Sequence, residues 1–157
     1  MARERVEGLR ELDRALAELP KATARNVLRR TLTTAAEPLV KEAAALAPDR
    51  PGKPANDLSS SIAVSSKLNR EQRKATRGDD KSFAEVYVGP DVSVPNAHGH
   101  WQEFGTVNHG PQPFMRPAWD GKQREVLEII KSETWNEIER AAKRLARKAA
   151  RLAAKGQ

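Results

Sequence analysis

The residues best suited to chemistry are histidines and a glutamate that lie close together: His98, His100, Glu103 and His109. Imidazole and carboxylate groups are common zinc ligands, and on a strand His98 and His100 would share one face. The spacing differs from the His-Glu-x-x-His of a helical zinc site, and a structural zinc needs a full tetrahedral set of convergent ligands. We therefore predict exposed loop histidines, with no metal site and no cofactor.

No arrangement suited to nucleophilic catalysis or phosphate binding occurs in the sequence. The absence of cysteine excludes disulfides, thiolate metal sites and a cysteine nucleophile. The serines at 59–61 lack a surrounding Gly-x-Ser-x-Gly turn, and no glycine-rich phosphate loop is found. Asp79 and Asp80 lie in a charged segment without a defined partner. These observations predict that the protein is not an enzyme.

The basic end of the chain accounts for its net charge of +7. Removing the seven basic residues of this tail from the total of 28 leaves 21, which equals the 21 acidic residues. Such a tail can be a solvated helix face, a sequence-independent contact with DNA, or a contact with an acidic neighbouring protein. We favour a subunit contact, because Leu145, Ala149 and Leu152 leave a narrow apolar stripe. The basic tail consists of Arg140, Lys143, Arg144, Arg147, Lys148, Arg151 and Lys155.

Two helices are expected in the first part of the chain. Apolar residues at steps of three and four over 6–19 mark one face of a helix, and Pro20 ends it or opens the next. A longer helix is expected over 21–47, with an apolar seam of the same spacing. Pro38 lies inside this pattern, and we expect it to kink the helix near Thr34.

A small antiparallel sheet is expected in the middle of the chain. Alternating apolar residues predict a first strand over 58–64, and the run 84–88 predicts a second that Gly89 and Pro90 stop. Residues 100–106 are expected to form a third strand. Prolines, glycines and polar runs predict long loops over 48–56, 67–82, 90–98 and 107–116.

A single long helix is expected at the end of the chain. Residues 122–155 contain no glycine and no proline, and their apolar residues recur at steps of three and four. Pro117 suits the first turn of this helix. The elements predict an α+β fold in which a helical pair and a long C-terminal helix pack on a small antiparallel sheet. We expect one domain over 1–157, with helices over 1–47, a sheet with long loops over 57–106 and the long helix over 117–155.

Three segments carry a resemblance to a known family. The first is Val-Glu-Gly-Leu-Arg-Glu-Leu at 6–12, before a basic, alanine-rich helix, and the second joins Ala-Leu-Ala-Pro at 45–48 to Leu-Ser-Ser-Ser-Ile at 58–62. The third is Val-Tyr-Val-Gly-Pro at 86–90, followed by Trp-Gln-Glu-Phe-Gly-Thr and by Gln-Pro-Phe-Met-Arg-Pro-Ala at 112–118. Over roughly residues 6–130 the chain resembles the phage tail-completion or neck proteins like gene product 10 of phage HK97.

The resemblance implies a structural virion protein at the head–tail junction, assembled in the cytoplasm of the bacterial host. It implies no catalysis and several copies in a homo-oligomeric ring around the DNA channel, with a hexamer favoured over a dodecamer. The partners it implies are further copies of the chain, neighbouring head-completion proteins, and tail-terminator or tail-tube proteins. Non-specific contact with DNA in the channel is an additional expectation. The resemblance does not explain the basic tail beyond Arg140.

Two short motifs supply the candidate residues of a subunit interface. Phe104 is expected to anchor the core at a strand end, Gly105 to adopt a backbone conformation closed to other residues, and Thr106 to hydrogen-bond the turn. Phe114 is expected in the core or at a subunit junction. The alternative to an interface is that these residues build the fold. The full candidate set is Glu103 facing a neighbour, Phe104, Gly105, Thr106, Phe114, and Arg116 as an intersubunit ion-pair partner.

A function of a different class remains open: a small DNA-binding protein that uses the basic C-terminal helix. Its affinity for DNA would fall steeply with salt and would depend on the basic tail. No membrane partner is expected, because no apolar run approaches the roughly 20 residues that span a bilayer.

Overall fold

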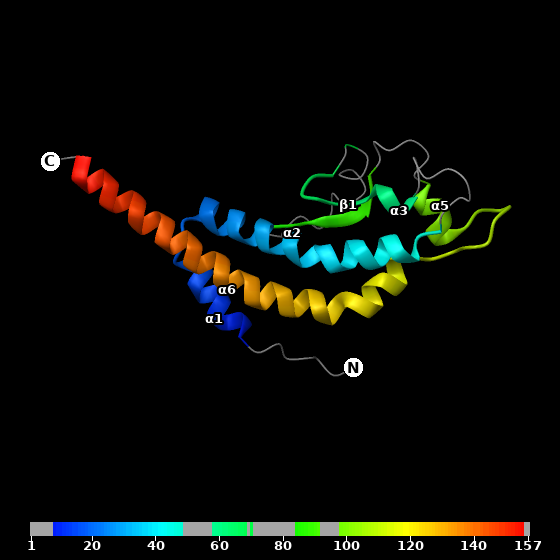
Figure 1. The fold of residues 1–157 in the computed structure, drawn as a ribbon, viewed down its shortest axis with the longest axis horizontal. Helices are drawn as coiled ribbons and strands as arrows, with labels where there is room; N and C mark the ends of the chain where they lie inside the picture. Colours follow the sequence, from blue (N-terminus) through cyan, green and yellow to red (C-terminus); the bar gives the residue numbers. More distant parts are fainter. Residues whose placement is uncertain (1–7, 49–57, 69, 71–83, 92–97, 156–157) are drawn as a thin grey trace.

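Two long helices lie side by side beneath a small sheet (Figure 1). The computed structural model describes residues 8–48, 58–68, 70, 84–91 and 98–155. Helix α2 lies between helix α6 on one side and the sheet on the other (Figure 1). The predicted α+β class is confirmed. The elements are α1 (Leu9–Ala17), α2 (Lys21–Leu46), α3 (Leu58–Ser61), β1 (Ile62–Ser65), β2 (Tyr87–Pro90), α5 (Gly99–Phe104) and α6 (Met115–Lys155).

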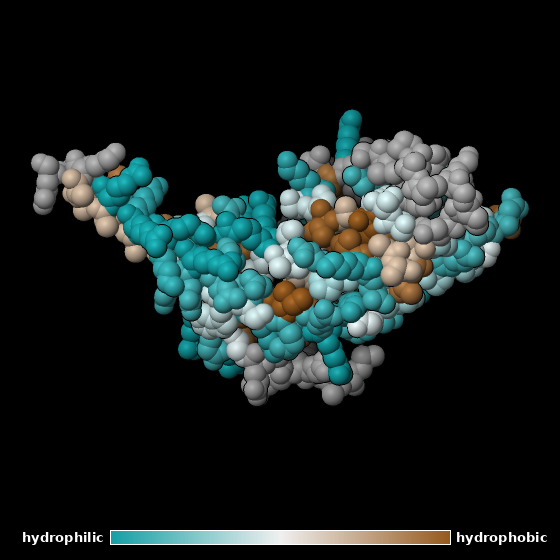
Figure 2. Space-filling model, viewed as in Figure 1, coloured by the Kyte–Doolittle hydropathy of each residue, from teal (hydrophilic) through white to brown (hydrophobic). Residues whose placement is uncertain are grey.

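The core has two parts that share α2 and α6. The larger part joins these helices to the sheet, and its largest fully buried side chain is Phe114, in a cluster of small and branched residues. The smaller part fixes α1 through Leu12, which packs with Val27, Ile138 and Ala141. Alanines at Ala35 and Ala118 are fully buried, so the helices approach closely there. Figure 2 shows apolar side chains gathered over the region where α2 lies beside β1.

The two N-terminal helices follow their apolar periodicity. The predicted helix over 6–19 is observed as α1, with Leu12 buried. The predicted helix over 21–47 is observed as α2, which continues as one helix through Pro38. Proline removes one helical hydrogen bond, and the long contact of α2 with α6 supports the helix on both sides of that position.

The sheet differs from its prediction in position and length. The expected strand over 58–64 begins instead with the helical turn α3, where the Ser61 hydroxyl donates to the Leu58 carbonyl at 2.7 Å. Serine competes for backbone partners in this way, which disfavours the strand until Ile62. Strand β2 is displaced from 84–88 to Tyr87–Pro90, so Gly89 and Pro90 belong to the strand rather than stop it. The two strands are antiparallel, with Ile62 opposite Pro90 and Ser65 opposite Tyr87.

The third strand expected over 100–106 is wrong, because these residues form helix α5 and a turn. The Gly105 N–H donates to the Trp101 carbonyl at 2.8 Å, which is the hydrogen bond of a glycine that ends a helix. Aromatic residues have a high strand propensity, but their spacing in this segment also suits a helix. His98 stacks on Trp101 with ring centroids 4.4 Å apart, and His100 lies 4.9 Å from Phe104.

Helix α6 begins at Met115, earlier than the predicted start, and includes Gly121 in its first turns. Pro117 lies in the first turn, as predicted, where its missing N–H has no helical partner to lose. The predicted loop over 107–116 therefore ends at Phe114, whereas most of the loops over 48–56, 67–82 and 90–98 lies outside the described residues. Within the described part of the chain, no helix is long and apolar enough to cross a membrane.

Candidate functional site

The start of α6 is held by a carboxylate from another helix. Glu103 of α5 accepts hydrogen bonds through Oε2 from the backbone N–H of Phe114 (2.8 Å) and Met115 (2.9 Å). Its Oε1 accepts from the backbone N–H of Arg116 at 3.2 Å. The first N–H groups of a helix have no partner within the helix, and the first turn of α6 contains no acid of its own. Glu103 therefore caps α6 from a distance and ties α5 to it.

The capping hydrogen bonds keep Glu103 ionised. Burial of the carboxyl group opposes ionisation, but the N–H groups of Met115, Phe114 and Arg116, together with the charge of Arg116, outweigh it. The pKa of Glu103 is therefore held below its usual value. A negative charge at this position also complements the positive end of the helix dipole.

The candidate interface residues separate into buried and exposed groups. Phe114 is 1% exposed and lies in the core, as predicted. Phe104 is 60% exposed, so its prediction as a core anchor is wrong: in α5 its side chain points outward and packs on His100. Thr106 bonds the turn as predicted, because its Oγ1 accepts from the Asn108 N–H at 3.3 Å. Whether Glu103 or Arg116 faces another subunit stays a prediction.

Gly105 occupies a position that other residues cannot adopt without strain. Its φ is +75°, and an added Cβ would lie 2.9 Å from the His109 carbonyl oxygen and 2.9 Å from the Pro111 nitrogen. Gly105 therefore has the expected backbone conformation that other residues avoid, with a positive φ. It turns the chain from α5 into the segment that leads to α6.

Replacing Gly105 with alanine is expected to lower the free energy of unfolding by about 1–3 kcal/mol, the usual cost of a strained backbone conformation. Urea denaturation measures the effect. Gly121→Ala is the control, because Gly121 lies inside α6 with open space around it and should gain about 1 kcal/mol in helix propensity. Equal stability of the two variants would contradict the prediction.

An apolar groove of about 740 Å³ lies beside the capped start of α6. Side chains of α2, β2, α5 and α6 form its walls, and Phe104 and Trp119 are each about half exposed or more there, at 60% and 48%. Sequence analysis did not find this groove, since its walls come from segments far apart in the chain. Half-exposed aromatic residues are common where proteins meet partners. The groove is lined by Leu32, Ala36, Leu39, Val86, Val88, Pro90, Gly99, His100, Glu103, Phe104, Phe114, Met115, Arg116, Trp119, Val126 and Ile130.

His98 and His100 do not share one face of a strand, because this segment is helical. His98 and His100 lie at the start of α5, and each ring packs on an aromatic neighbour. Among the described residues, no group of three or more histidines, cysteines or acids is positioned to hold a metal ion.

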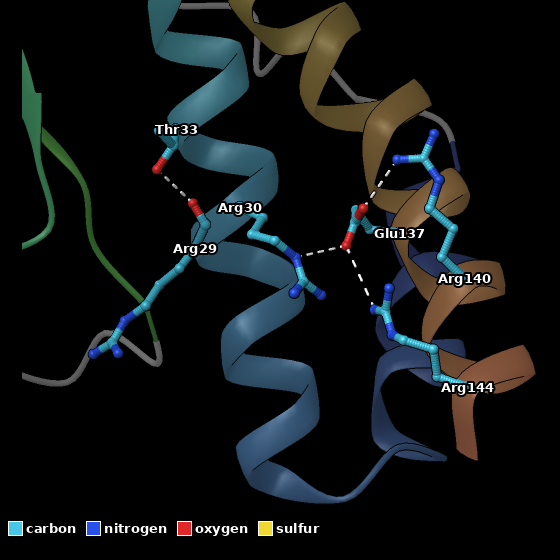
Figure 3. Close-up of polar contacts among 6 residues, drawn as sticks. All are labelled: Arg29, Arg30, Thr33, Glu137, Arg140 and Arg144. Carbon is cyan, nitrogen blue, oxygen red and sulfur yellow. Dashed lines mark hydrogen bonds and ion pairs between the residues drawn. The ribbon is translucent and has the colours of Figure 1, made fainter. Parts of the chain in front are cut away.

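A second polar cluster joins α2 to the middle of α6 (Figure 3). Glu137 accepts from Arg30 Nε at 2.7 Å and from Arg140 Nη1 at 3.0 Å, and Arg144 Nη2 lies 3.8 Å away. Burial opposes ionisation of Glu137, but the hydrogen bond from Arg140 and the nearby Arg30 outweigh it and lower its pKa. The sequence offered no signal for this pairing, because Arg30 and Glu137 are 107 residues apart.

Glu137→Gln is expected to lower the free energy of unfolding by about 1 kcal/mol, because the arginines are more than half exposed and water screens the pairs. The loss should shrink in 1 M NaCl, where screening acts over about 3 Å. Glu139→Gln is the control: Glu139 is 68% exposed and lies 3.9 Å from Lys143, so its loss should be close to zero. Similar losses of stability in the Glu137→Gln and Glu139→Gln variants would contradict the prediction that the ion pairs of Glu137 stabilise the fold.

The basic tail begins at this cluster and continues beyond the rest of the protein. In Figure 1 the red C-terminal end of α6 extends past α1 and α2. We call residues 142–155 the arm. Within the arm, the side chains over 142–154 are exposed except Leu145, which is half-buried. Figure 2 shows the arm as mostly hydrophilic on the visible face.

A family model described as "Bacteriophage HK97-gp10, putative tail-component" matches residues 10–105. The chain belongs to this family. Membership of the HK97-gp10-like family gives the protein a structural role in a phage tail. The match runs from α1 to Gly105, so the capping glutamate lies inside it, whereas α6 and its arm lie beyond it. No curated protein or solved structure matches the chain.

Proposed function

We propose that this member of the HK97-gp10-like family is a non-enzymatic virion protein of the neck or tail-completion ring that joins head to tail. The observation that carries the proposal is the presence of two different surfaces at the two ends of α6: a half-exposed aromatic groove at its start and the basic arm at its end. Different surfaces on one molecule suit head-to-tail contacts, which close into a ring when the rotation permits.

The proposed ring is a hexamer, which would match the symmetry of a tail tube; a dodecamer would match a portal. It lies at the head–tail junction of the virion, after assembly in the bacterial cytoplasm. Its neighbours are head-completion proteins and tail-terminator or tail-tube proteins. Phe104 and Arg116, which are exposed, belong to the contact surface, whereas Glu103, Gly105 and Phe114 position them.

Electron microscopy of a phage lysate tests this function directly. With the reading frame disrupted in the parent phage, we expect DNA-filled heads and complete tails lying apart, and restoration of whole particles by the full chain supplied from a plasmid. Intact infectious particles at normal yield, without the plasmid, would overturn the proposal.

A second candidate function is DNA binding by the arm, favoured by the exposure of its basic side chains. DNA binding predicts affinity that falls steeply with salt, with a salt dependence that weakens as Arg147, Lys148 and Arg151 are changed to glutamine. Measurement of duplex-DNA binding by the full chain at several salt concentrations separates the candidates. Under the adaptor function, the triple variant should change DNA affinity little.

A further inference from the structure

A second pocket, of about 340 Å³, lies between α2, the middle of α6 and the residue that follows β1. Its lining differs from that of the apolar groove, because every residue that lines it has a charged side chain or a hydroxyl group. Helix α6 contributes Glu133, Glu137 and Arg140, and Ser66 follows β1, whereas the other lining residues belong to α2. Such a wall suits a charged or polar ligand rather than an apolar one.

Arginines at this pocket outnumber the carboxylates with which they can pair. Nitrogen atoms of Arg30, Arg140 and Arg144 lie 2.7, 3.0 and 3.8 Å from the carboxylate oxygens of Glu137. One carboxylate balances only one of these three charges. Arg29 adds a fourth guanidinium and makes no ion pair within the described part of the chain. Four arginines therefore meet the two glutamates of the wall, which leaves an excess of two positive charges.

The arginines also keep N–H groups that no described residue uses. A guanidinium has five N–H donors, and Arg30 gives only its Nε to Glu137, whereas Arg140 gives only its Nη1. Figure 3 shows the two terminal nitrogens of Arg30 turned away from Glu137, and Arg29 extending from the other side of α2. Both paired arginines are more than half exposed, so their remaining donors are open to a ligand. The ion pairs with Glu137 meanwhile hold Arg30 and Arg140 in place.

A buried hydroxyl group at the pocket has no hydrogen-bond partner. Thr31 lines the pocket and is 1% exposed, and its Oγ1 makes no hydrogen bond within the described residues. Most buried polar groups are hydrogen-bonded, so an unpaired one points to a partner such as a ligand, an ion or water. Thr34 and Ser66 add two exposed hydroxyl groups to the same wall.

We propose that this pocket binds a phosphate group, which accepts hydrogen bonds from Arg29, Arg30 and Arg140 and from the hydroxyl groups beside them. The planar guanidinium matches the oxygens of phosphate, and hydrogen bonds between two charged groups are the strongest of their kind. The phosphate is either free or part of a DNA backbone, and its chemistry at the pocket is the same. The site is separate from the arm, and the proposal does not rest on the neck-ring function.

Isothermal titration calorimetry of the full chain with inorganic phosphate, at an ionic strength matched with sodium chloride, tests the site. We expect saturable binding, and Arg29→Gln should raise the Kd at least about tenfold, as for loss of a charged hydrogen bond. The variant should fold like the wild type, because Arg29 is exposed and makes no ion pair within the described residues. The control is Arg147→Gln, which removes the same charge from an exposed position of the arm outside the pocket.

A short DNA duplex, titrated in the same way, distinguishes the two sources of phosphate. If Arg29→Gln weakens duplex binding at least about tenfold more than Arg147→Gln does, and inorganic phosphate competes with the duplex, the DNA backbone supplies the group. If Arg29→Gln weakens the binding of inorganic phosphate alone, the ligand is free phosphate. The proposal is overturned if neither probe binds saturably, or if the two variants change the affinity for both probes equally, as expected for diffuse attraction by net charge.

Discussion

Replacing Phe114 with alanine should lower the free energy of unfolding by about 3–5 kcal/mol, the usual cost of removing a buried aromatic ring. Phe114 is 1% exposed and is the largest fully buried side chain of the larger core, which joins α2, α6 and the sheet. Its loss leaves a cavity that alanines such as Ala35 and Ala118 cannot fill. Urea denaturation monitored by circular dichroism measures the change.

The matched control for this variant is Phe104→Ala. Phe104 is the same residue type in a neighbouring segment, but it is 60% exposed, so its replacement should change stability by no more than about 0.5 kcal/mol. A large loss of stability in Phe104→Ala would mean that the Phe104 side chain is buried rather than exposed. A small loss at Phe114 would place the centre of the core elsewhere.

Replacing Glu103 with glutamine should lower the free energy of unfolding at neutral pH by about 1–2 kcal/mol, as for loss of a helix cap. The amide keeps one acceptor oxygen but loses the charge that complements the helix start. Because the folded-state pKa of Glu103 is lowered, its stabilisation is complete above the usual glutamate pKa of about 4.3 and is lost as pH falls through the lower, folded value. Stability of both proteins is measured from pH 7 down to pH 3.

The difference in free energy of unfolding between the wild type and Glu103→Gln should therefore be constant near neutral pH and become smaller in acid. Glu128→Gln provides the control, because the Glu128 side chain is 70% exposed and its carboxylate pairs with Lys131 on the same helix. A difference that stays constant down to pH 3 would show that the charge of Glu103 contributes nothing.

The sequence predicted the helices well because each has a continuous periodic face. The apolar steps that define α2 and α6 survive in the structure, where these helices form the longest contact of the described fold. The short segments were predicted poorly for physical reasons. Ser61 bonds the backbone of its own turn, and Gly105 ends a helix where a strand was expected.

The candidate site was predictable only in part. Gly105 and Thr106 were identified from local turn chemistry, and Phe114 from its position between two prolines. The capping role of Glu103 depends on N–H groups that follow it by 11 to 13 residues, across a turn whose shape the sequence does not state. The groove and the Glu137 cluster join distant segments, so no local pattern could have revealed them.

The cap on α6 has a mechanical consequence. Helix α6 contains 41 residues; its capped start is fixed to α5, whereas the side chains near its far end, over 146–154, are exposed. The arm therefore acts as a lever beyond the packed part of α6: a tilt of about 5° near Ala141 displaces the tip of this segment, about 20 Å long, by about 2 Å. A small change in how α6 packs on α2 would therefore produce a larger displacement at the C-terminal tip of α6. In the proposed ring, such displacements would change the angle between neighbouring copies, so related chains that pack α2 on α6 slightly differently would form rings of different copy number.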